Sequence, residues 1–134
     1  MDKLYIASDH AGYQVKSLFL SKFPTIKDLG PDNSLSTDYP LYANKMCNIL
    51  KNEKGILICY TGIGMSIAAN RFPHIKAGLV HSVEDLILAR QHNDINVLCL
   101  AAKNFSLNIE DVVECFLNTS FEGGRHERRL QLLK

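Results

Sequence analysis

Cys59 is the residue of this sequence best placed to do chemistry, because it ends a short apolar run, Ile56 to Ile58, and precedes a glycine loop. The loop holds Gly62 and Gly64, and small residues at helical spacing follow it. A thiolate acts as a base or nucleophile, and glycines before a helix present backbone N–H groups to an anion. Residues 55–72 therefore indicate either a base beside an oxyanion cradle or a plain strand–turn–helix with a buried thiol.

Polar side chains follow four of the expected strands at the point where each strand ends. They are Asp9 and His10 after the first strand, Cys59 and Thr61 after the third, His81 and Ser82 after the fourth, and Lys103 after the fifth. The carboxyl ends of parallel strands share one edge of the sheet, where α/β proteins keep their ligand sites. We therefore expect these side chains to converge, although Asp9 taken alone is typical of a helix cap.

Two further groups have both a functional and a plain interpretation. His92 ends a predicted helix, as either a solvated histidine stabilised by the helix dipole or an acid–base group. Arg125 and Arg129 share a helix face and suit a phosphate dianion, although basic runs are more often solvated tails. A C-terminal helix over about residues 122–134 would reach a neighbouring subunit, so we expect a site shared in a dimer.

Apolar runs alternate with helical patterns along the whole chain. Strands are expected at Leu4 to Ala7, Thr25 to Leu29, Ile56 to Ile58, Ile75 to Val80 and Ile95 to Leu100. Helices are expected at Val15 to Phe23, Pro40 to Leu50, Ser66 to Phe72, Ser82 to Asn93 and Ile109 to Leu117. This alternation predicts a three-layer α/β/α Rossmann-like sandwich around a parallel sheet of about five strands. The first βα turn lacks the GxGxxG fingerprint, which disfavours a nucleotide-dependent dehydrogenase.

Length and composition fit one domain over residues 1–134. A net charge of +1 gives no electrostatic reason to bind nucleic acid or an anionic membrane, and no apolar run approaches the roughly 18 residues of a membrane span. The first residues lead straight into a strand pattern without a signal peptide. The four cysteines form no CxxC pair, so we expect reduced thiols in the cytoplasm, without a disulfide framework or a metal site.

Five segments together resemble the ribose-5-phosphate isomerase B family, which includes the galactose-6-phosphate isomerase subunits. The segments are Ser8 to Gly12, Asp38-Tyr39-Pro40, Cys59 with Thr61 to Asn70, Ala89 to Asp94, and Gly123 to Arg129. They lie in the family's order over essentially the whole chain, which makes the set far more specific than any one motif. The likeness is greatest to ribose-5-phosphate isomerase B itself.

The resemblance implies a cofactor-free isomerase of the pentose phosphate pathway, which interconverts ribose 5-phosphate and ribulose 5-phosphate. It also implies a homodimer, possibly paired into a tetramer, whose active sites are shared between subunits. The resemblance implies that Cys59 is the base and that the backbone of Gly62, Ile63, Gly64, Met65 and Ser66 forms the enediolate cradle. It implies that Asp9 and His92 open the sugar ring, with Thr61 and Asn93 assisting. The implied phosphate ligands are His10, Arg125 and Arg129. Backbone amides that hold the oxyanion would remove the need for a metal.

Two residues depart from the family's usual pattern. Tyr60 replaces a glycine, and it would be strained if that position has a positive φ; otherwise its ring points away from the sugar or narrows the pocket. Lys103 replaces an arginine and keeps the charge without the bidentate fork.

Two alternatives to the five-carbon isomerase stay open. One is an isomerase of a six-carbon phosphate, allose or galactose 6-phosphate, and the other is a non-catalytic phosphosugar-binding module, which Tyr60 favours.

Overall fold

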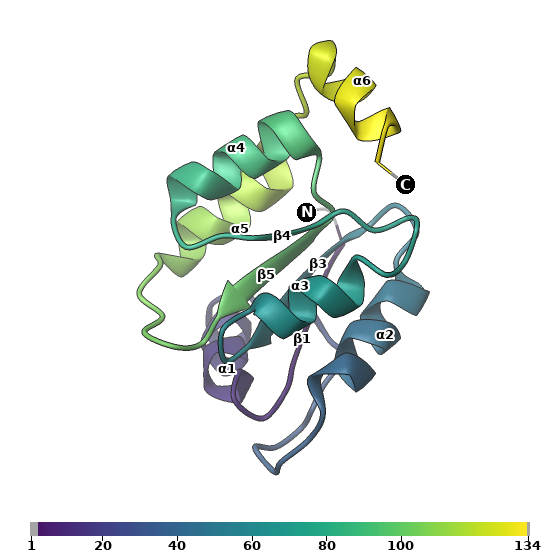
Figure 1. The fold of residues 1–134 in the computed structure, drawn as a ribbon. Coiled ribbons are helices and arrows are strands. Elements are labelled where there is room, and N and C mark those ends of the chain that lie inside the picture. The colour runs from purple at the N-terminus through teal and green to yellow at the C-terminus, as the bar shows by residue number, and fades with distance from the viewer. Residues whose placement is uncertain (1–2, 134) are drawn as a thin grey trace.

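The computed structural model describes residues 3–133, which form five strands and six helices (Figure 1). The strands are β1 (Leu4–Ser8), β2 (Lys27–Asp28), β3 (Lys54–Cys59), β4 (Ala77–Leu79) and β5 (Val97–Ala101). The helices are α1 (Tyr13–Lys22), α2 (Tyr39–Ile49), α3 (Ile63–Ala69), α4 (Val83–Asn93), α5 (Ile109–Asn118) and α6 (Arg125–Gln131). Met1, Asp2 and Lys134, which belong to the predicted domain, lie outside the described residues.

The five strands form one sheet in the order β2-β1-β3-β5-β4, and every neighbouring pair is parallel. The predicted parallel sheet is therefore confirmed. The central strands β1, β3 and β5 are buried on both faces, which explains their nearly continuous apolar sequences. Because all strands run the same way, all their carboxyl ends lie at one edge of the sheet.

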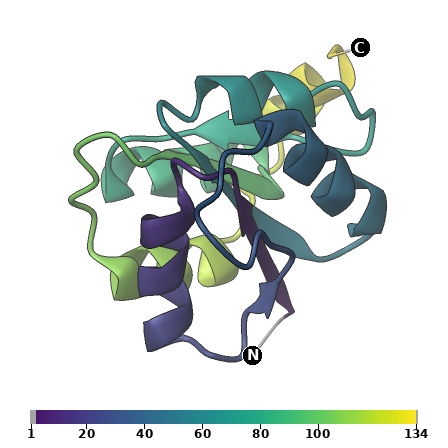
Figure 2. The ribbon, with the colours of Figure 1, turned by 90° about the horizontal axis from the view of Figure 1, so that it is seen from below.

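Helices cover both faces of the sheet, and Figure 2 shows α1 and α5 on one side with α2 and α3 on the other. Each face has its own apolar core. The first core holds Val15 and Phe19 of α1, Leu86 of α4, and Val112 and Phe116 of α5, packed on Ile6, Ile56 and Ile58. The second core holds Met46 and Cys47 of α2 with Met65 and Ala69 of α3, packed on Leu57, Cys59 and Cys99. The predicted α/β/α layering is thus confirmed.

Several expected boundaries are wrong. Helix α6 spans Arg125–Gln131 and not about residues 122–134, because Gly123 and Gly124 take positive φ just before it. Helix α3 begins at Ile63, three residues before the predicted start, because Gly62 takes a left-handed conformation (φ +79°) that turns the chain sharply out of β3. Strand β2 has only two residues, and β4 spans Ala77–Leu79 within a longer apolar run. Both are edge strands with one partner each, so pairing stops where β1 or β5 diverges from them.

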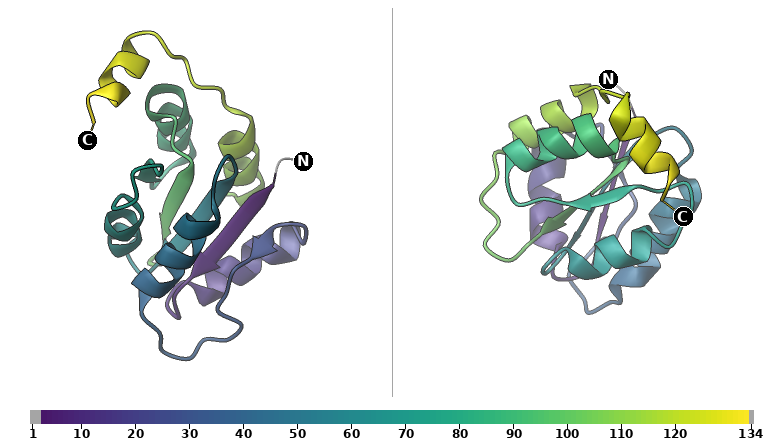
Figure 3. Two further views of the ribbon diagram at one scale, coloured as in Figure 1. Left: turned by 90° about the vertical axis from the view of Figure 1, so that its right-hand side faces the viewer. Right: turned by 45° about the horizontal axis from the view of Figure 1, so that its top comes forward.

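Helix α6 lies outside the two helix layers, next to the end of α4 (Figure 3). The chain reaches it after α5 through Gly123 and Gly124, which both have positive φ. The backbone N–H of Glu122 donates to the carbonyl of Gln91 at 3.0 Å, so the segment before α6 is attached to the end of α4. No helix in residues 3–133 is both long enough and apolar enough to cross a membrane.

The loop between β1 and α1 packs closely on the end of β3. A Cβ atom at Gly12 would lie 2.5 Å from the carbonyl oxygen of Ile58, a backbone atom that has no freedom to rotate away. The Asp9 backbone N–H donates to that same carbonyl at 3.2 Å, and the Asp9 side chain accepts from the Gly12 N–H at 3.0 Å. Gly12 therefore sets how closely Asp9 approaches the end of β3.

We predict that Gly12→Ala lowers the free energy of unfolding by about 1–3 kcal/mol, because the added methyl forces the α1 N-terminus off β3. Urea denaturation measures this change. Gln14→Ala, at an exposed position of the same helix, is the control and should stay within about 0.5 kcal/mol of wild type. Equal stability of the two variants would show that the β1–α1 loop tolerates displacement.

Candidate active site

The carboxyl edge of the sheet gathers the polar residues that follow β1, β3 and β5. Asp9 and Cys59 are nearly buried, with 6% and 4% of their surfaces exposed, while Thr61 and Lys103 are exposed. The Lys103 backbone N–H donates to the carbonyl of Tyr60 at 2.9 Å, so the loops after β3 and β5 run side by side. The expected convergence at one edge is therefore what the structure shows.

The Cys59 thiol lies on the face of the sheet that α3 covers. It belongs to the same apolar core as Met65 in the first turn of that helix. Burial raises the pKa of the Cys47 thiol to about 11, and it also raises the pKa of Cys99 and of Cys115. Among the four thiols, Cys59 is the one at the carboxyl end of a strand, which is the position that suits proton transfer at this edge.

The first turn of α3 provides the backbone cradle. The N–H groups of Gly64 and Met65 have no partners within the helix and lie at the carboxyl edge, whereas the Ile63 N–H donates to Thr61 Oγ1 at 3.3 Å and the Ser66 N–H to the Gly62 carbonyl at 3.1 Å. Side chains at two glycine positions would not fit: a Cβ at Gly62 would lie 2.5 Å from Leu79 Cδ1, and one at Gly64 would lie 2.5 Å from Tyr39 Cζ. Tyr39, the first residue of α2, thus lies over the cradle, a contact that the sequence alone did not reveal.

Tyr60 has an ordinary backbone conformation. Among the described residues, Asp94 and Asn104 are the non-glycine residues with positive φ, so Tyr60 is not strained. Its side chain is 56% exposed. A strained backbone at Tyr60 is therefore excluded. The Tyr60 carbonyl accepts from the Lys103 N–H, and the exposed ring lies at the rim of the carboxyl edge.

His10 extends the carboxyl edge toward α2. Its Nδ1 lies 3.2 Å from the backbone nitrogen and 3.1 Å from the carbonyl oxygen of Thr37, in the loop before α2. The ring is exposed, and the next residue but one, Gly12, is buried against β3. His10 therefore lies where a polar group bound at this edge would meet it.

His92 and Asn93 lie at the opposite edge of the sheet. Helix α4 leaves the carboxyl edge after β4 and must return to the amino edge, where β5 begins. The four steps of β5 from Val97 to Ala101 span about 13 Å at about 3.3 Å per residue. Figure 1 shows α6 beyond the end of α4, while the β5 arrowhead points the other way. One chain therefore does not bring His92 and Cys59 together.

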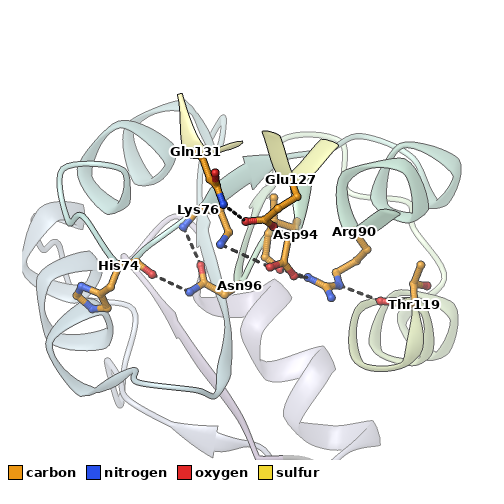
Figure 4. Close-up of polar contacts among 9 residues, drawn as sticks. His74, Lys76, Arg90, Asp94, Asn96, Thr119, Glu127 and Gln131 are labelled. Carbon is orange, nitrogen blue, oxygen red and sulfur yellow. Dashed lines mark hydrogen bonds and ion pairs between the residues drawn. The ribbon is translucent and has the colours of Figure 1, made fainter. Parts of the chain in front are cut away.

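A polar network around Arg90 and Asp94 fixes the end of α4 (Figure 4). The buried Arg90 side chain donates to the carbonyl of Ile95 at 2.6 Å, to Asp94 Oδ1 at 3.0 Å and to the carbonyl of Thr119 at 3.1 Å. Asp94, in a left-handed conformation that ends α4, also lies 3.5 Å from Lys76 Nζ. Arg90 therefore joins the end of α4 to the turn before β5 and to the end of α5, and it fixes the backbone of α4 two residues before His92.

His126 of α6 stacks on His92, with ring centroids 4.2 Å apart and planes 11° from parallel. Glu122 Oε1 lies 3.5 Å from His126 Nε2 and 3.8 Å from His92 Nε2. Both histidines and Arg129 border a cavity of about 330 Å³. Burial, with added repulsion from His92 and the nearby arginines, lowers the pKa of His126. No role was predicted for Glu122 or His126, and only the four-residue spacing of the pair hints at their contact.

The predicted site residues thus form two groups in one chain. The carboxyl-edge group comprises Asp9, His10, Cys59, Thr61 and the cradle from Gly62 to Ser66. The amino-edge group comprises His92, Asn93, Arg125 and Arg129, and the two arginines are exposed on α6. The first group has the parts for proton transfer to and from an oxyanion, and the second has the parts for binding a phosphate.

The layered fold and the thiol beside a backbone cradle define a Rossmann-like α/β enzyme. The chain belongs to the Ribose/Galactose Isomerase family, whose sequence model matches residues 4–133. The resemblance inferred from the sequence motifs is therefore confirmed.

Relatives match over nearly their whole length. A Rickettsia conorii protein, whose name goes no further than sugar phosphate isomerase, is 45% identical over 139 residues, covering 98% of this chain and 96% of its own. The structure of a Thermotoga maritima ribose 5-phosphate isomerase superimposes with a TM-score of 0.87 at 43% identity, covering 97% and 95% of the two chains. That of Mycoplasma genitalium ribose-5-phosphate isomerase B with bound ribulose-5-phosphate gives a TM-score of 0.83 at 38% identity, covering 96% and 91%.

We predict that His126 makes stability depend on pH. Its pKa in the folded protein lies below the ordinary 6.5, so the folded state binds this proton less readily than the unfolded chain does. The contribution of the neutral His126 ring to the free energy of unfolding is therefore fully present above pH 6.5. It is lost as the pH falls from 6.5 through the pKa of His126 in the folded protein. Urea denaturation in metal-free buffer should show wild type losing more stability than His126→Gln between about pH 7.5 and 5.5. Parallel pH profiles would contradict the assignment.

Proposed function

We propose that this single-domain protein interconverts D-ribose 5-phosphate and D-ribulose 5-phosphate through an enediolate. The observation that carries the proposal is the position of Cys59, a nearly buried thiol at the end of β3 beneath the glycine-capped first turn of α3. Family membership and a relative's structure with bound ribulose-5-phosphate support the same reaction. Its four free thiols fit the reducing cytoplasm.

The carboxyl-edge group supplies the proton transfer. In the open-chain sugar, the Cys59 thiolate removes the proton from C2 and returns it to C1. The proton of the C2 hydroxyl passes to the oxygen on C1, so that the carbonyl moves from C1 to C2. The intermediate enediolate carries a negative charge that the cradle from Gly62 to Ser66 stabilises through the backbone N–H groups of Gly64 and Met65. The Ile63 and Ser66 N–H groups already donate to Thr61 Oγ1 at 3.3 Å and to the Gly62 carbonyl at 3.1 Å. A positioned base contributes roughly 100- to 10,000-fold, and each preorganised oxyanion donor on the order of 3 kcal/mol. The net reaction is a redistribution of protons, so no redox cofactor is needed.

Ring opening precedes this transfer, and it is the task of Asp9 and His92, with Thr61 and Asn93 assisting. The Asp9 carboxylate is oriented by the Gly12 N–H at 3.0 Å, which fixes it beside the end of β3. His92 is 38% exposed and lies at the other edge of its own chain. An acid and a base that work on one sugar must both contact it, so His92 has to come from another copy of the protein.

We therefore propose a homodimer with two shared sites. In a twofold dimer the same surfaces meet twice, so the α4–α6 end of each copy lies over the carboxyl edge of the other. Apolar side chains around that surface support the pairing: Ile63 and Ile67 of α3 are each 54% exposed, and Leu88 of α4 is 46% exposed. A groove of about 810 Å³ bordered by the segment after α3, by β4, by α4 and by α6 offers room for the partner. Pairing of dimers into tetramers is compatible with this arrangement.

The phosphate is held by the arginines of the second copy. Arg125 and Arg129 lie on one face of α6, both exposed, and together provide two guanidinium forks for a dianion. His10 lies at the carboxyl edge that these arginines would cover, and it completes the phosphate site from the first copy. Lys103 adds one further positive charge at that edge.

We predict that Cys59→Ala lowers kcat for ribulose 5-phosphate formation by roughly 100- to 10,000-fold while phosphosugar binding remains measurable. A coupled assay measures turnover, and calorimetry measures binding. Cys115→Ala, which removes a partly buried thiol of α5 that packs against the first core, is the matched control and should retain wild-type turnover. Full activity of Cys59→Ala would exclude this residue as the base.

The same assay with allose 6-phosphate and galactose 6-phosphate tests the substrate. We expect the five-carbon phosphates to be turned over with the highest kcat/KM. Preference for a six-carbon phosphate would contradict the substrate but not the base. Binding of ribose 5-phosphate without turnover by the wild type would contradict the enzyme and favour a binding module.

A further inference from the structure

Three side chains that ligate metals meet beyond the end of α4. The Nε2 atoms of His92 and His126 lie 3.8 and 3.5 Å from Glu122 Oε1, and one ligand atom from each residue lies within 4.8 Å of the others. Among residues 3–133 this is the one group of three histidine, cysteine or acidic side chains that is so close. Two imidazoles and a glutamate are a ligand set used by three-ligand zinc sites.

A second observation points to a ligand at the same place. His126 is only 7% exposed, and its Nε2 has no hydrogen-bond partner among the described residues. A buried polar atom left without a hydrogen-bond partner destabilises the folded protein, which a bound ligand would relieve. Neither the proposed isomerisation nor the packing of α6 satisfies this nitrogen. The cavity of about 330 Å³ beside both histidines gives an ion access to it.

We infer that His92, Glu122 and His126 form a binding site for a divalent cation of the Zn²⁺ type. Metal–ligand bonds of about 2.1 Å in a tetrahedral site place ligand atoms about 3.4 Å apart, close to the two observed separations. The stacked rings must turn so that their lone pairs converge. His92 and Glu122, which are 38% and 51% exposed, have the freedom to make that movement around the buried His126. Water or substrate fills the fourth position.

The kind of ligand atoms at the site decides which metals it can bind. Arg125 and Arg129 place positive charge near His126, and Glu122 provides one carboxylate. Mg²⁺ and Ca²⁺ need several oxygen ligands, so this site does not suit them. Zn²⁺ bonds readily to neutral imidazole, and the site offers two imidazole rings.

The consequence for activity rests on the proposed function. A His92 ring held by Zn²⁺ is no longer available for ring opening, so Zn²⁺ acts as an inhibitor that a chelator reverses. The metal would be a regulator of the isomerase and not its cofactor.

Calorimetric titration of chelator-treated protein with Zn²⁺ alone tests the site without reference to activity. Wild type should bind Zn²⁺ at one site per chain and should give no binding signal with Mg²⁺. Removing an outer-shell partner of a metal site commonly lowers the metal affinity by about 10-fold or more, and removing a direct ligand should lower it at least as much. Glu122→Gln should therefore weaken Zn²⁺ binding by about 10-fold or more. Glu127→Gln, an exposed change on neighbouring α6, is the matched control and should bind like wild type.

Equal Zn²⁺ affinity in wild type and Glu122→Gln would overturn the site, as would weakening by Glu127→Gln to the same extent. Glu122 is half-exposed, so its variant tests the site even if His126→Ala fails to fold. Inhibition assays with Zn²⁺ then separate the two claims. Binding that leaves isomerase activity unchanged would contradict the role of His92, while a protein without isomerase activity that binds Zn²⁺ through Glu122 would contradict the proposed function only.

Discussion

The common direction of the five strands is the constraint on which the rest of this structure depends. It collects every strand's carboxyl end at one edge, and so brings Asp9, Cys59 and Lys103 into one neighbourhood. It also requires each crossover helix to carry the chain back to the other edge. Helix α4 makes that return, and His92 near its end is separated from Cys59 by the length of the sheet. A reaction that needs both residues therefore needs a second chain.

Close backbone contacts give the carboxyl edge its shape. Gly12 lets α1 start directly against the end of β3, and this contact fixes Asp9. Gly62 turns the chain into α3 against β4 and β5, and Gly64 leaves space for the Tyr39 ring. In each case a side chain would displace a neighbour that belongs to another element. The glycines of the motifs thus hold the thiol and the cradle at a fixed spacing, which is what preorganised oxyanion stabilisation requires.

Much of this arrangement follows from the sequence. The alternation of apolar runs and helical patterns predicted the layers and the parallel sheet, and the motifs predicted the family. The direction of α4 was also implied, since a helix between parallel strands must end at the amino edge. The start of α3 was missed because Gly62 and Gly64 are typical of a loop, and glycine is a poor helix former. The stack of His126 on His92 depends on how the chain turns at Gly123 and Gly124, and no local pattern encodes that path.

The most direct test of a shared site is a heterodimer of two variants that are each inactive. One subunit carries Cys59→Ala, and the other carries Arg125→Ala with Arg129→Ala; different affinity tags allow the mixed dimer to be purified. If each site combines Cys59 of one copy with the arginines of the other, one of the two sites is intact. The account then predicts about half of the wild-type kcat per dimer. A mixed dimer as inactive as its parents would show that each site lies within one chain and would contradict the account.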